Sequence, residues 1–251
     1  MRISIITPTF NSELFLECCV KSVASQTYNN IEHIVIDGAS VDKTIQIVNK
    51  CLDKISVFKS EPDTGIYNAL NKGLKNSTGD IVGFLHSDDF YASNDSLESI
   101  ANSFIVKNVD AVYGDLEYVD RLDSSKVLRR WRSCEYKDGD LGWGWMPPHP
   151  TFYVRREWYE RINGFEEKYK ISADYLSVLK MFSNPIFKAT YIPKVITRMR
   201  IGGVSNQNVR SIIKKTCEDW QVLRSQEASC LKSIRCLAWK NISKVKQFQV
   251  F

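Results

Sequence analysis

Short apolar runs alternate with segments of helical spacing along the first hundred residues. The apolar runs, which predict buried strands, cover 3–7, 31–36, 55–58 and 81–85. Helical spacing follows each run and predicts helices that begin near Ser12, begin near Asp42, cover 64–75 and cover about 95–106. This alternation is typical of an α/β fold with a doubly wound, mostly parallel sheet.

The second half of the chain is less regular. Further strands are predicted over 111–113, 116–119, 127–131 and 151–154, and a helix over 175–182. Residues 138–150 form a loop rich in Gly, Trp and Pro. Two more helices, over 209–223 and 231–245, predict a C-terminal helical extension.

Composition places the chain among ordinary globular proteins, with 43% apolar and 25% charged residues in 251. The longest apolar run falls short of the roughly 18 residues that a membrane-spanning helix needs. Residues 1–6 enter a strand without the features of a signal peptide, which predicts a cytoplasmic protein. Seven scattered cysteines without a Cys-x-x-Cys pair favour neither a zinc site nor a disulfide framework.

The net charge of +5 is unevenly distributed. From Arg198 onward there are 11 Lys and Arg against 3 Asp and Glu, whereas the rest of the chain is slightly acidic. Such a basic tail favours an anionic partner, either a membrane surface or nucleic acid. Nucleic acid is the weaker alternative, because the chain carries no recognised nucleic-acid motif.

Polar residues gather where the predicted parallel strands end. They are Thr7, Thr9, Asn11, Asp37, Glu61, Asp63, Ser87, Asp88 and Asp89. The fold brings these ends to one edge of the sheet, where ligands bind. Clustered carboxylates suit Mg²⁺ or Mn²⁺, and such an ion neutralises a departing diphosphate as a Lewis acid. The phosphate loop of ATPases and the Gly-x-Gly-x-x-Gly of dinucleotide-binding proteins are both absent.

The sequence resembles the family 2 glycosyltransferases, which are inverting enzymes with the A-type nucleotide-sugar fold. The resemblance rests on ISIITPTFN (3–11), the segment 22–44 with VIDGAS, SEPDTGIYNALNKG through HSDD (60–89), HPTFYVRR (149–156), INGFEEKYKISADY (162–175) and IGGVS (201–205). These motifs cover residues 1–205 in the expected order, and together they are specific. The branch that they resemble assembles bacterial O-antigen and exopolysaccharide on lipid carriers.

The resemblance implies a nucleotide pocket at the first two strands. Thr7, Pro8 and Thr9 are expected to line the pocket for the base, and Asp37 to hydrogen-bond the uracil. One departure is Gly38 and Ala39, which stand where the family often has a second acidic residue after Asp37. Asp37 as a simple turn cap is the alternative interpretation.

The resemblance also implies roles for five later residues. Asp63 and Lys72 are expected near the base, ribose or phosphates, although Lys72 on a solvated helix face is an equal alternative. Asp88 corresponds to the aspartate on the ribose side and Asp89 to the metal ligand. Asp174 corresponds to the catalytic base, and its alternative is an N-cap of the following helix.

The function implied is a metal-dependent inverting transferase of one hexose, with glucose the first expectation. The donor is a UDP-sugar, and the acceptor is a hydroxyl of a lipid-diphosphate-linked sugar, which gives a β-linkage. Residues 1–205 form the catalytic domain and 206–251 a basic extension. Two alternatives are a sugar-nucleotide nucleotidyltransferase, which should carry a Gly- and Arg-rich loop near residue 10, and a non-catalytic nucleotide- or sugar-binding module.

The basic extension predicts peripheral attachment to the inner face of the cytoplasmic membrane. The residues that motivate this are Lys232, Arg235, Trp239, Lys240, Lys244, Lys246, Phe248 and Phe251. In the alternative, this helix packs on the catalytic domain and its lysines are solvated. Trp143, Trp145 and His149 in the preceding loop are candidates for acceptor contacts or for structural anchors.

Overall fold

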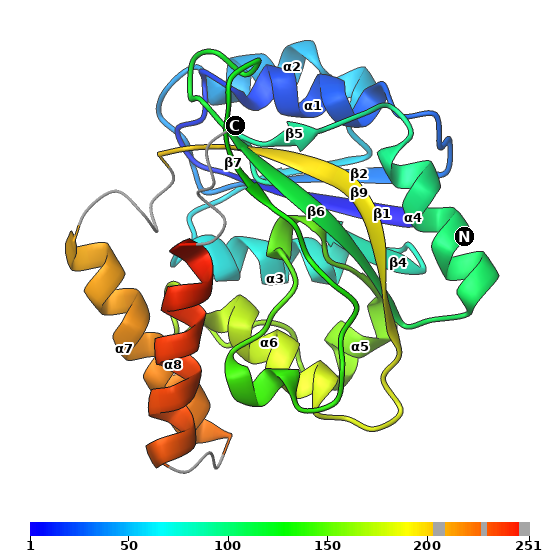
Figure 1. The fold of residues 1–251 in the computed structure, drawn as a ribbon. Coiled ribbons are helices and arrows are strands. Elements are labelled where there is room, and N and C mark those ends of the chain that lie inside the picture. The colour runs from blue at the N-terminus through cyan, green and yellow to red at the C-terminus, as the bar shows by residue number, and fades with distance from the viewer. Residues whose placement is uncertain (203–208, 227–229, 246–251) are drawn as a thin grey trace.

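The computed structural model describes residues 1–202, 209–226 and 230–245, which surround one nine-stranded sheet (Figure 1). The strand order is β3-β2-β1-β4-β8-β6-β9-β5, and β7 also pairs with β6. The strands are β1 (Ile3–Thr9), β2 (Ile31–Asp37), β3 (Val57–Ser60), β4 (Ile81–Phe84), β5 (Phe90–Tyr91), β6 (Ala111–Val119), β7 (Val127–Trp131), β8 (Tyr153–Arg155) and β9 (Ala189–Arg200). The helices are α1 (Leu16–Ala24), α2 (Thr44–Lys50), α3 (Ile66–Asn76), α4 (Ser96–Lys107), α5 (Arg156–Arg161), α6 (Ala173–Phe182), α7 (Val209–Ser225) and α8 (Cys230–Val245).

The first half of the sheet is parallel, and the second half is mixed. β1 runs parallel to β2 and β4, and β2 runs parallel to β3. β8 is antiparallel to β4 and β6, and β6 is parallel to β9. The carboxyl ends of β1 to β4 therefore meet at one edge. The predicted α/β fold with a mostly parallel sheet and C-terminal helices is confirmed.

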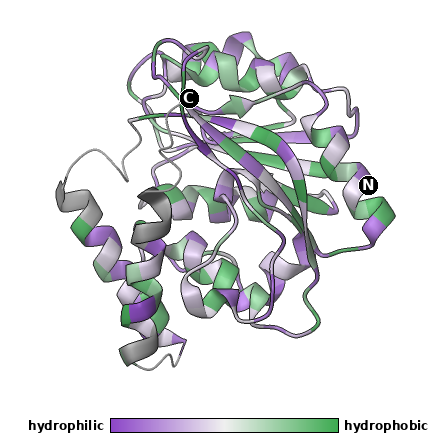
Figure 2. Cartoon of the chain, viewed as in Figure 1, coloured by the Kyte–Doolittle hydropathy of each residue, from purple (hydrophilic) through white to green (hydrophobic). Residues whose placement is uncertain are grey.

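Helices cover both faces of the sheet, which explains why the strands are apolar runs without alternation. Ile3 and Ile5 pack with residues of α1 and α4, whereas Ile6 and Ile34 pack with residues of α3 and α6. Successive residues of β1 thus serve opposite faces, as the pleat requires. Figure 2 shows hydrophobic residues along the central strands and on the inward sides of these helices.

β9 is a long strand that the sequence analysis does not predict. It contains Pro193, which has no N–H for a strand ladder and so hides the strand pattern. The pairing with β6 steps from Tyr113–Tyr191 to Asp115–Val195, and this irregularity contains the proline. Tertiary pairing with a fully buried neighbour thus forms a strand where local preference is weak.

The C-terminal helices pack against the rest of the fold. Val222 and Leu223 of α7 and Cys236 of α8 are buried in the same core cluster as residues of α6. Lys240 of α8 forms a buried salt bridge with Asp219 of α7, with 2.8 Å between Nζ and Oδ2. Figure 1 shows the two helices side by side, next to α6. Helix α8 therefore packs against the rest of the fold through one face, which includes the buried Lys240, while its Arg235 and Trp239 side chains stay exposed.

Parts of the predicted extension are not covered by this description. Residues 203–205 of the last family motif, together with Lys246, Phe248 and Phe251 of the predicted membrane-facing tail, lie outside the described residues. Among the helices that are described, none is both long enough and apolar enough to cross a bilayer.

Deletion of residues 231–251 is expected to destabilise the protein strongly. It removes Lys240 and leaves Asp219 buried without its partner, a change that costs about 3–5 kcal/mol. It also uncovers Tyr175, whose hydroxyl lies 3.3 Å from the Cys236 sulfur. Thermal unfolding measures the effect, with deletion of 246–251 as the control. An unchanged melting temperature for the longer deletion would show that α8 is no part of the folded unit.

Candidate active site

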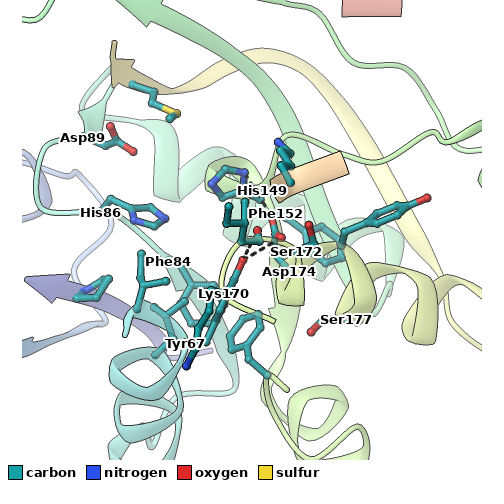
Figure 3. Close-up of a pocket in the computed structure, with 18 of the residues that line it drawn as sticks. Tyr67, Phe84, His86, Asp89, His149, Phe152, Lys170, Ser172, Asp174 and Ser177 are labelled. Carbon is teal, nitrogen blue, oxygen red and sulfur yellow. Dashed lines mark hydrogen bonds and ion pairs between the residues drawn. The ribbon is translucent and has the colours of Figure 1, made fainter. Parts of the chain in front are cut away.

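A cavity of about 880 Å³ lies beyond the carboxyl ends of β1 and β4 (Figure 3). Its wall comes from the segments after these strands, from α3, α6 and the β6–β7 hairpin, and from α7 and α8. This is the edge at which open α/β sheets bind ligands, and the volume suits a small-molecule site.

The cavity brings together most of the predicted site residues. Those that line it are Pro8, Thr9, Asp63, Asp88, Asp89 and Asp174. Those that are not part of its lining are Thr7, Asp37 and Lys72. Residues from four separate segments of the sequence therefore share one site, although their individual roles stay predictions.

Thr7 and Asp37 do not reach the cavity, although Pro8 and Thr9 of the same strand end line it. The Thr7 hydroxyl lies 3.0 Å from Nε2 of His33, and both side chains are buried. The fully buried Asp37 carboxylate accepts hydrogen bonds from the backbone and hydroxyl of Ser40 and from the hydroxyl of Ser60. Asp37 therefore fixes the loop after β2, and its predicted contact with uracil stays a prediction.

Asp63 occupies the space next to Gly38, where the family often carries a second acidic residue. A Cβ added to Gly38 would lie only 2.5 Å from Oδ2 of Asp63. The Asp63 carboxylate faces the cavity and also accepts a hydrogen bond from the backbone of Gly65, at 2.9 Å. The Asp63 carboxylate therefore leaves no room for a side chain at position 38 unless it moves. Lys72 instead pairs with Glu61, at 2.9 Å.

Asp88 and Asp89 follow β4, and one carboxylate oxygen of Asp89 lacks a hydrogen-bond partner within the described residues. The Asp89 side chain is buried, and its Oδ1 accepts a hydrogen bond from the backbone of Arg200 at 3.3 Å. Its Oδ2 has no hydrogen-bond partner within the described part of the chain. Burial, together with neighbouring Asp88, raises the pKa of Asp89 well above its usual range. An added positive charge at this carboxylate would offset both effects.

These residues fit a divalent cation that the protein binds with few ligands. The described residues contain no group of three or more His, Cys, Asp and Glu that could hold a metal by itself. Magnesium-like ions keep water and phosphate oxygens as ligands and take one or two carboxylates from the protein. Asp89, with its unpartnered Oδ2, would supply that carboxylate.

Asp174 lies on the opposite side of the cavity, in the first turn of α6. The Tyr67 hydroxyl is 3.1 Å from Oδ1 of Asp174 and 2.7 Å from the carbonyl of Ile171. Burial raises the pKa of Tyr67 well above its usual range, so the phenol keeps its proton and donates it. Asp174 is thus a half-buried carboxylate held in place by a neutral donor, which leaves Oδ2 for a substrate.

Two histidines lie between the two acidic groups, as Figure 3 shows. The rings of His86 and His149 meet edge to face with their centroids 5.7 Å apart. Nδ1 of His149 is 3.8 Å from Oδ2 of Asp174. Burial lowers the pKa of His149 to about 4, so its imidazole is neutral at pH 7 and forms no ion pair with Asp174.

Glu218 of α7 is a residue of this site that the sequence analysis misses. Its Oε2 accepts hydrogen bonds from the backbone N–H groups of Ile171, at 2.7 Å, and Ser172, at 3.1 Å. These groups begin the turn that carries Asp174. The charge pattern could have pointed to Glu218, because Glu218 and Asp219 are two adjacent acidic residues in a strongly basic segment.

Replacement of Glu218 by Ala is expected to lower kcat more than it changes the KM for the donor. The loss leaves the buried N–H of Ser172 and the partly buried N–H of Ile171 without an acceptor and loosens the turn before Asp174. Glu218→Gln keeps one acceptor oxygen and should restore most of the rate. Steady-state kinetics of the two variants test this. Equal kcat in Glu218→Ala and the wild type would contradict the positioning role.

Comparison with known proteins agrees with this geometry. The profile described as "Glycosyl transferase family 2" matches residues 4–171. The chain belongs to glycosyltransferase family 2. It is therefore a nucleotide-sugar-dependent glycosyltransferase, and the two alternatives, a nucleotidyltransferase and a non-catalytic module, are set aside.

Two relatives of this glycosyltransferase are similar over most of its length. A "PGL/p-HBAD biosynthesis glycosyltransferase" of Mycobacterium bovis is 29% identical over 216 residues, which cover 81% of this chain and 78% of the relative. An uncharacterized glycosyltransferase of Haemophilus influenzae is 32% identical over 206 residues, which cover 81% of this chain and 80% of the relative.

Solved structures share the A-type fold. Residues 1–349 of S. aureus TarS in complex with UDP-GlcNAc give a TM-score of 0.70 at 22% identity, over 89% of this chain and 65% of that one. The mannosyltransferase PcManGT of Pyrobaculum calidifontis, in complex with GDP-Man and Mn²⁺, gives a TM-score of 0.67 at 22% identity. That match covers 95% of this chain and 68% of the PcManGT chain. The chain spans 42% of the longer TarS chain that it also matches. These structures confirm the predicted fold class.

Proposed function

We propose that this glycosyltransferase moves one hexose from a UDP-sugar to a hydroxyl of a lipid-diphosphate-linked sugar, with inversion. The observation that carries the proposal is the placement of two acidic groups on opposite sides of one cavity. Asp88 and Asp89 lie where β4 ends, and Asp174 lies on α6 across the cavity. The solved complexes of TarS with UDP-GlcNAc and of PcManGT with GDP-Man and Mn²⁺ support a nucleotide-sugar donor and a divalent ion.

The mechanism follows from this placement. Pro8, Thr9 and Asp63 would hold the nucleotide, with Asp88 on its ribose side, and Asp89 would hold Mn²⁺ or Mg²⁺. The bound ion supplies Lewis-acid neutralisation of the diphosphate. Oδ2 of Asp174 takes the proton of the acceptor hydroxyl as its oxygen bonds to the anomeric carbon. The sugar–phosphate bond breaks on the opposite face, so an α-linked donor gives a β-linked product.

A donor panel tests this proposal. UDP-, GDP- and dTDP-sugars are incubated with the protein and Mn²⁺, and nucleotide release is measured with and without EDTA. We expect UDP-sugars, with UDP-glucose first, to be hydrolysed only when the metal is present. The anomeric configuration of a transferred sugar is read by NMR. Hydrolysis of GDP- or dTDP-sugars alone, or full activity in EDTA, would contradict the proposal.

We propose a place for this reaction in the assembly of bacterial surface glycans, such as O-antigen or exopolysaccharide, at the inner face of the cytoplasmic membrane. The support is the basic C-terminal segment and an aromatic patch beside the cavity. Trp143 and Trp239 are both nearly half exposed, with ring centroids 5.8 Å apart, and Arg235 lies over the Trp143 ring at 4.2 Å. Aromatic and basic residues together favour a membrane interface.

Vesicle binding tests the membrane proposal without disturbing the fold. Because deletion of α8 would damage the core, the sharper variants are Trp239→Ser and Arg235→Ser, both at exposed side chains. We expect the full chain to sediment with vesicles that contain anionic lipid at low salt, and each variant to bind less. Leu128→Ser, at another exposed apolar position, is the control. Absence of wild-type binding at low salt would refute peripheral attachment.

A further inference from the structure

One side of the cavity is basic, in contrast to the acidic ends of the strands. The cationic residues that line it are Arg121, Arg129, Arg132, Lys170, Lys215 and Lys240. Three belong to the segment around the β6–β7 hairpin, and two belong to the C-terminal helices. A donor site and a base account for the acidic residues of this cavity and leave the cations without a role.

The three lysines that line this side of the cavity differ in their hydrogen-bond and ion-pair partners. Lys240 forms its buried salt bridge with Asp219, and Lys170 donates to the carbonyl of Thr64 at 3.2 Å. Lys215, which is half-buried on α7, forms neither a hydrogen bond nor an ion pair within the described residues. Asp174 and Asp219 are near enough to stabilise the charge of Lys215, but neither forms an ion pair with it, and a partly buried ammonium without a direct partner is costly for the free protein. It is therefore a candidate to bind an anion.

The surroundings of Lys215 locate this anion on the Asp174 side of the cavity. Burial lowers the pKa of Lys215, and the charge of Lys240 lowers it further, whereas Asp174 acts in the opposite direction. The charge of Lys215 in turn lowers the pKa of His149, which lies next to Asp174. Arg129 is near enough to repel Lys215, so two cations converge on the same space.

We propose that Lys215 and Arg129 form a subsite for a phosphate group of the acceptor, next to the hydroxyl that Asp174 deprotonates. This inference rests on the proposed function and deepens it. The ligand class is a phosphate or diphosphate ester, and its negative charge pairs with the Lys215 ammonium and the Arg129 guanidinium. The helix that positions Asp174 through Glu218 thereby also selects the acceptor.

A phosphate at this position has two sources, the diphosphate of the donor and the phosphate of the acceptor. The donor diphosphate belongs with Asp88 and Asp89 at the end of β4, whereas Lys215 lies with Asp174 and His149. The acceptor is therefore the source that the geometry favours. An experiment that first fills the donor site separates the two.

The probe is geranyl diphosphate, with geraniol as its uncharged counterpart. Each is titrated calorimetrically into the protein saturated with UDP and Mn²⁺. We expect wild-type protein to bind geranyl diphosphate and to bind geraniol much more weakly. Lys215→Met should weaken the binding of geranyl diphosphate by about 10- to 100-fold, which corresponds to the contribution of a hydrogen bond to a charged group. Lys215→Arg should keep most of the affinity.

Lys214→Met is the matched control, because Lys214 is the preceding residue of α7, is exposed and does not line the cavity. It should bind geranyl diphosphate as the wild type does. Equal weakening in both variants would show a non-specific charge effect and overturn the proposal. A parallel loss of UDP affinity in Lys215→Met would assign the subsite to the donor and also overturn it. Failure of wild-type protein to bind UDP would instead refute the proposed function.

Discussion

Asp89→Asn is expected to lower transfer by about 10³-fold or more, because a metal that stabilises a departing diphosphate contributes several kcal/mol. Oδ2 of Asp89 is buried and has no partner in the described residues, which is the arrangement that a cation ligand would show before the cation binds. The amide keeps the acceptor for the Arg200 N–H but loses the charge. Transfer and Mn²⁺ binding in the presence of UDP are both measured.

The same substitution should leave the metal-free protein folded, since it replaces a carboxyl that burial makes difficult to ionise. Thermal unfolding in EDTA checks this. Asp120→Asn, at a half-buried carboxylate outside the cavity, is the control and should keep both activity and metal binding. If Asp89→Asn retained Mn²⁺ binding and transfer, the metal ligand would have to be sought elsewhere in the cavity.

Asp174→Asn is expected to lower kcat by about 10²–10⁴-fold, the usual contribution of general acid–base catalysis. The amide oxygen still accepts the hydrogen bond of Tyr67, so the geometry of the first turn of α6 is retained. Because Asp174 lies across the cavity from Asp88 and Asp89, affinity for UDP should stay near that of the wild type. Pre-steady-state transfer and UDP titration separate the two effects.

Asp138→Asn, at an exposed acid outside the cavity, is the control and should transfer normally. An Asp174→Asn enzyme with near-normal kcat would move the role of base to Asp63 or His149. His149 is neutral at pH 7 because burial lowers its pKa to about 4, so it is in the protonation state of a base. Its ring lies 3.8 Å from Asp174 and could reach the same hydroxyl.

The local pattern of apolar and polar residues was sufficient to predict most strands and helices in the first half of the chain. The runs 3–7, 31–36 and 81–85 are rich in apolar residues because helices cover both faces of the sheet, so the strands show no alternation of buried and exposed positions. Once the sheet is parallel, its strand ends must share an edge. That rule alone places Asp63 and the Asp88–Asp89 pair in one cavity.

The same reasoning could not separate residues that face the cavity from those that support it. Thr7 and Asp37 stand at strand ends and Lys72 stands on α3, all three within the family motifs. Their side chains nevertheless contact His33, Ser40 and Ser60, and Glu61 in turn. The direction of a side chain at a strand end depends on the conformation of the following loop, and the sequence pattern does not predict that conformation.

The sequence by itself determined the alternation of strands and helices, the edge at which the acids meet and the family motifs. Only the tertiary structure decided that the basic C-terminal segment takes part in the site. Glu218 holds the turn before Asp174, and Lys215 faces the cavity. The physical reason is that helical periodicity reports which face of α7 is buried but not what it is buried against. That partner is set by packing on α6, between segments far apart in the chain.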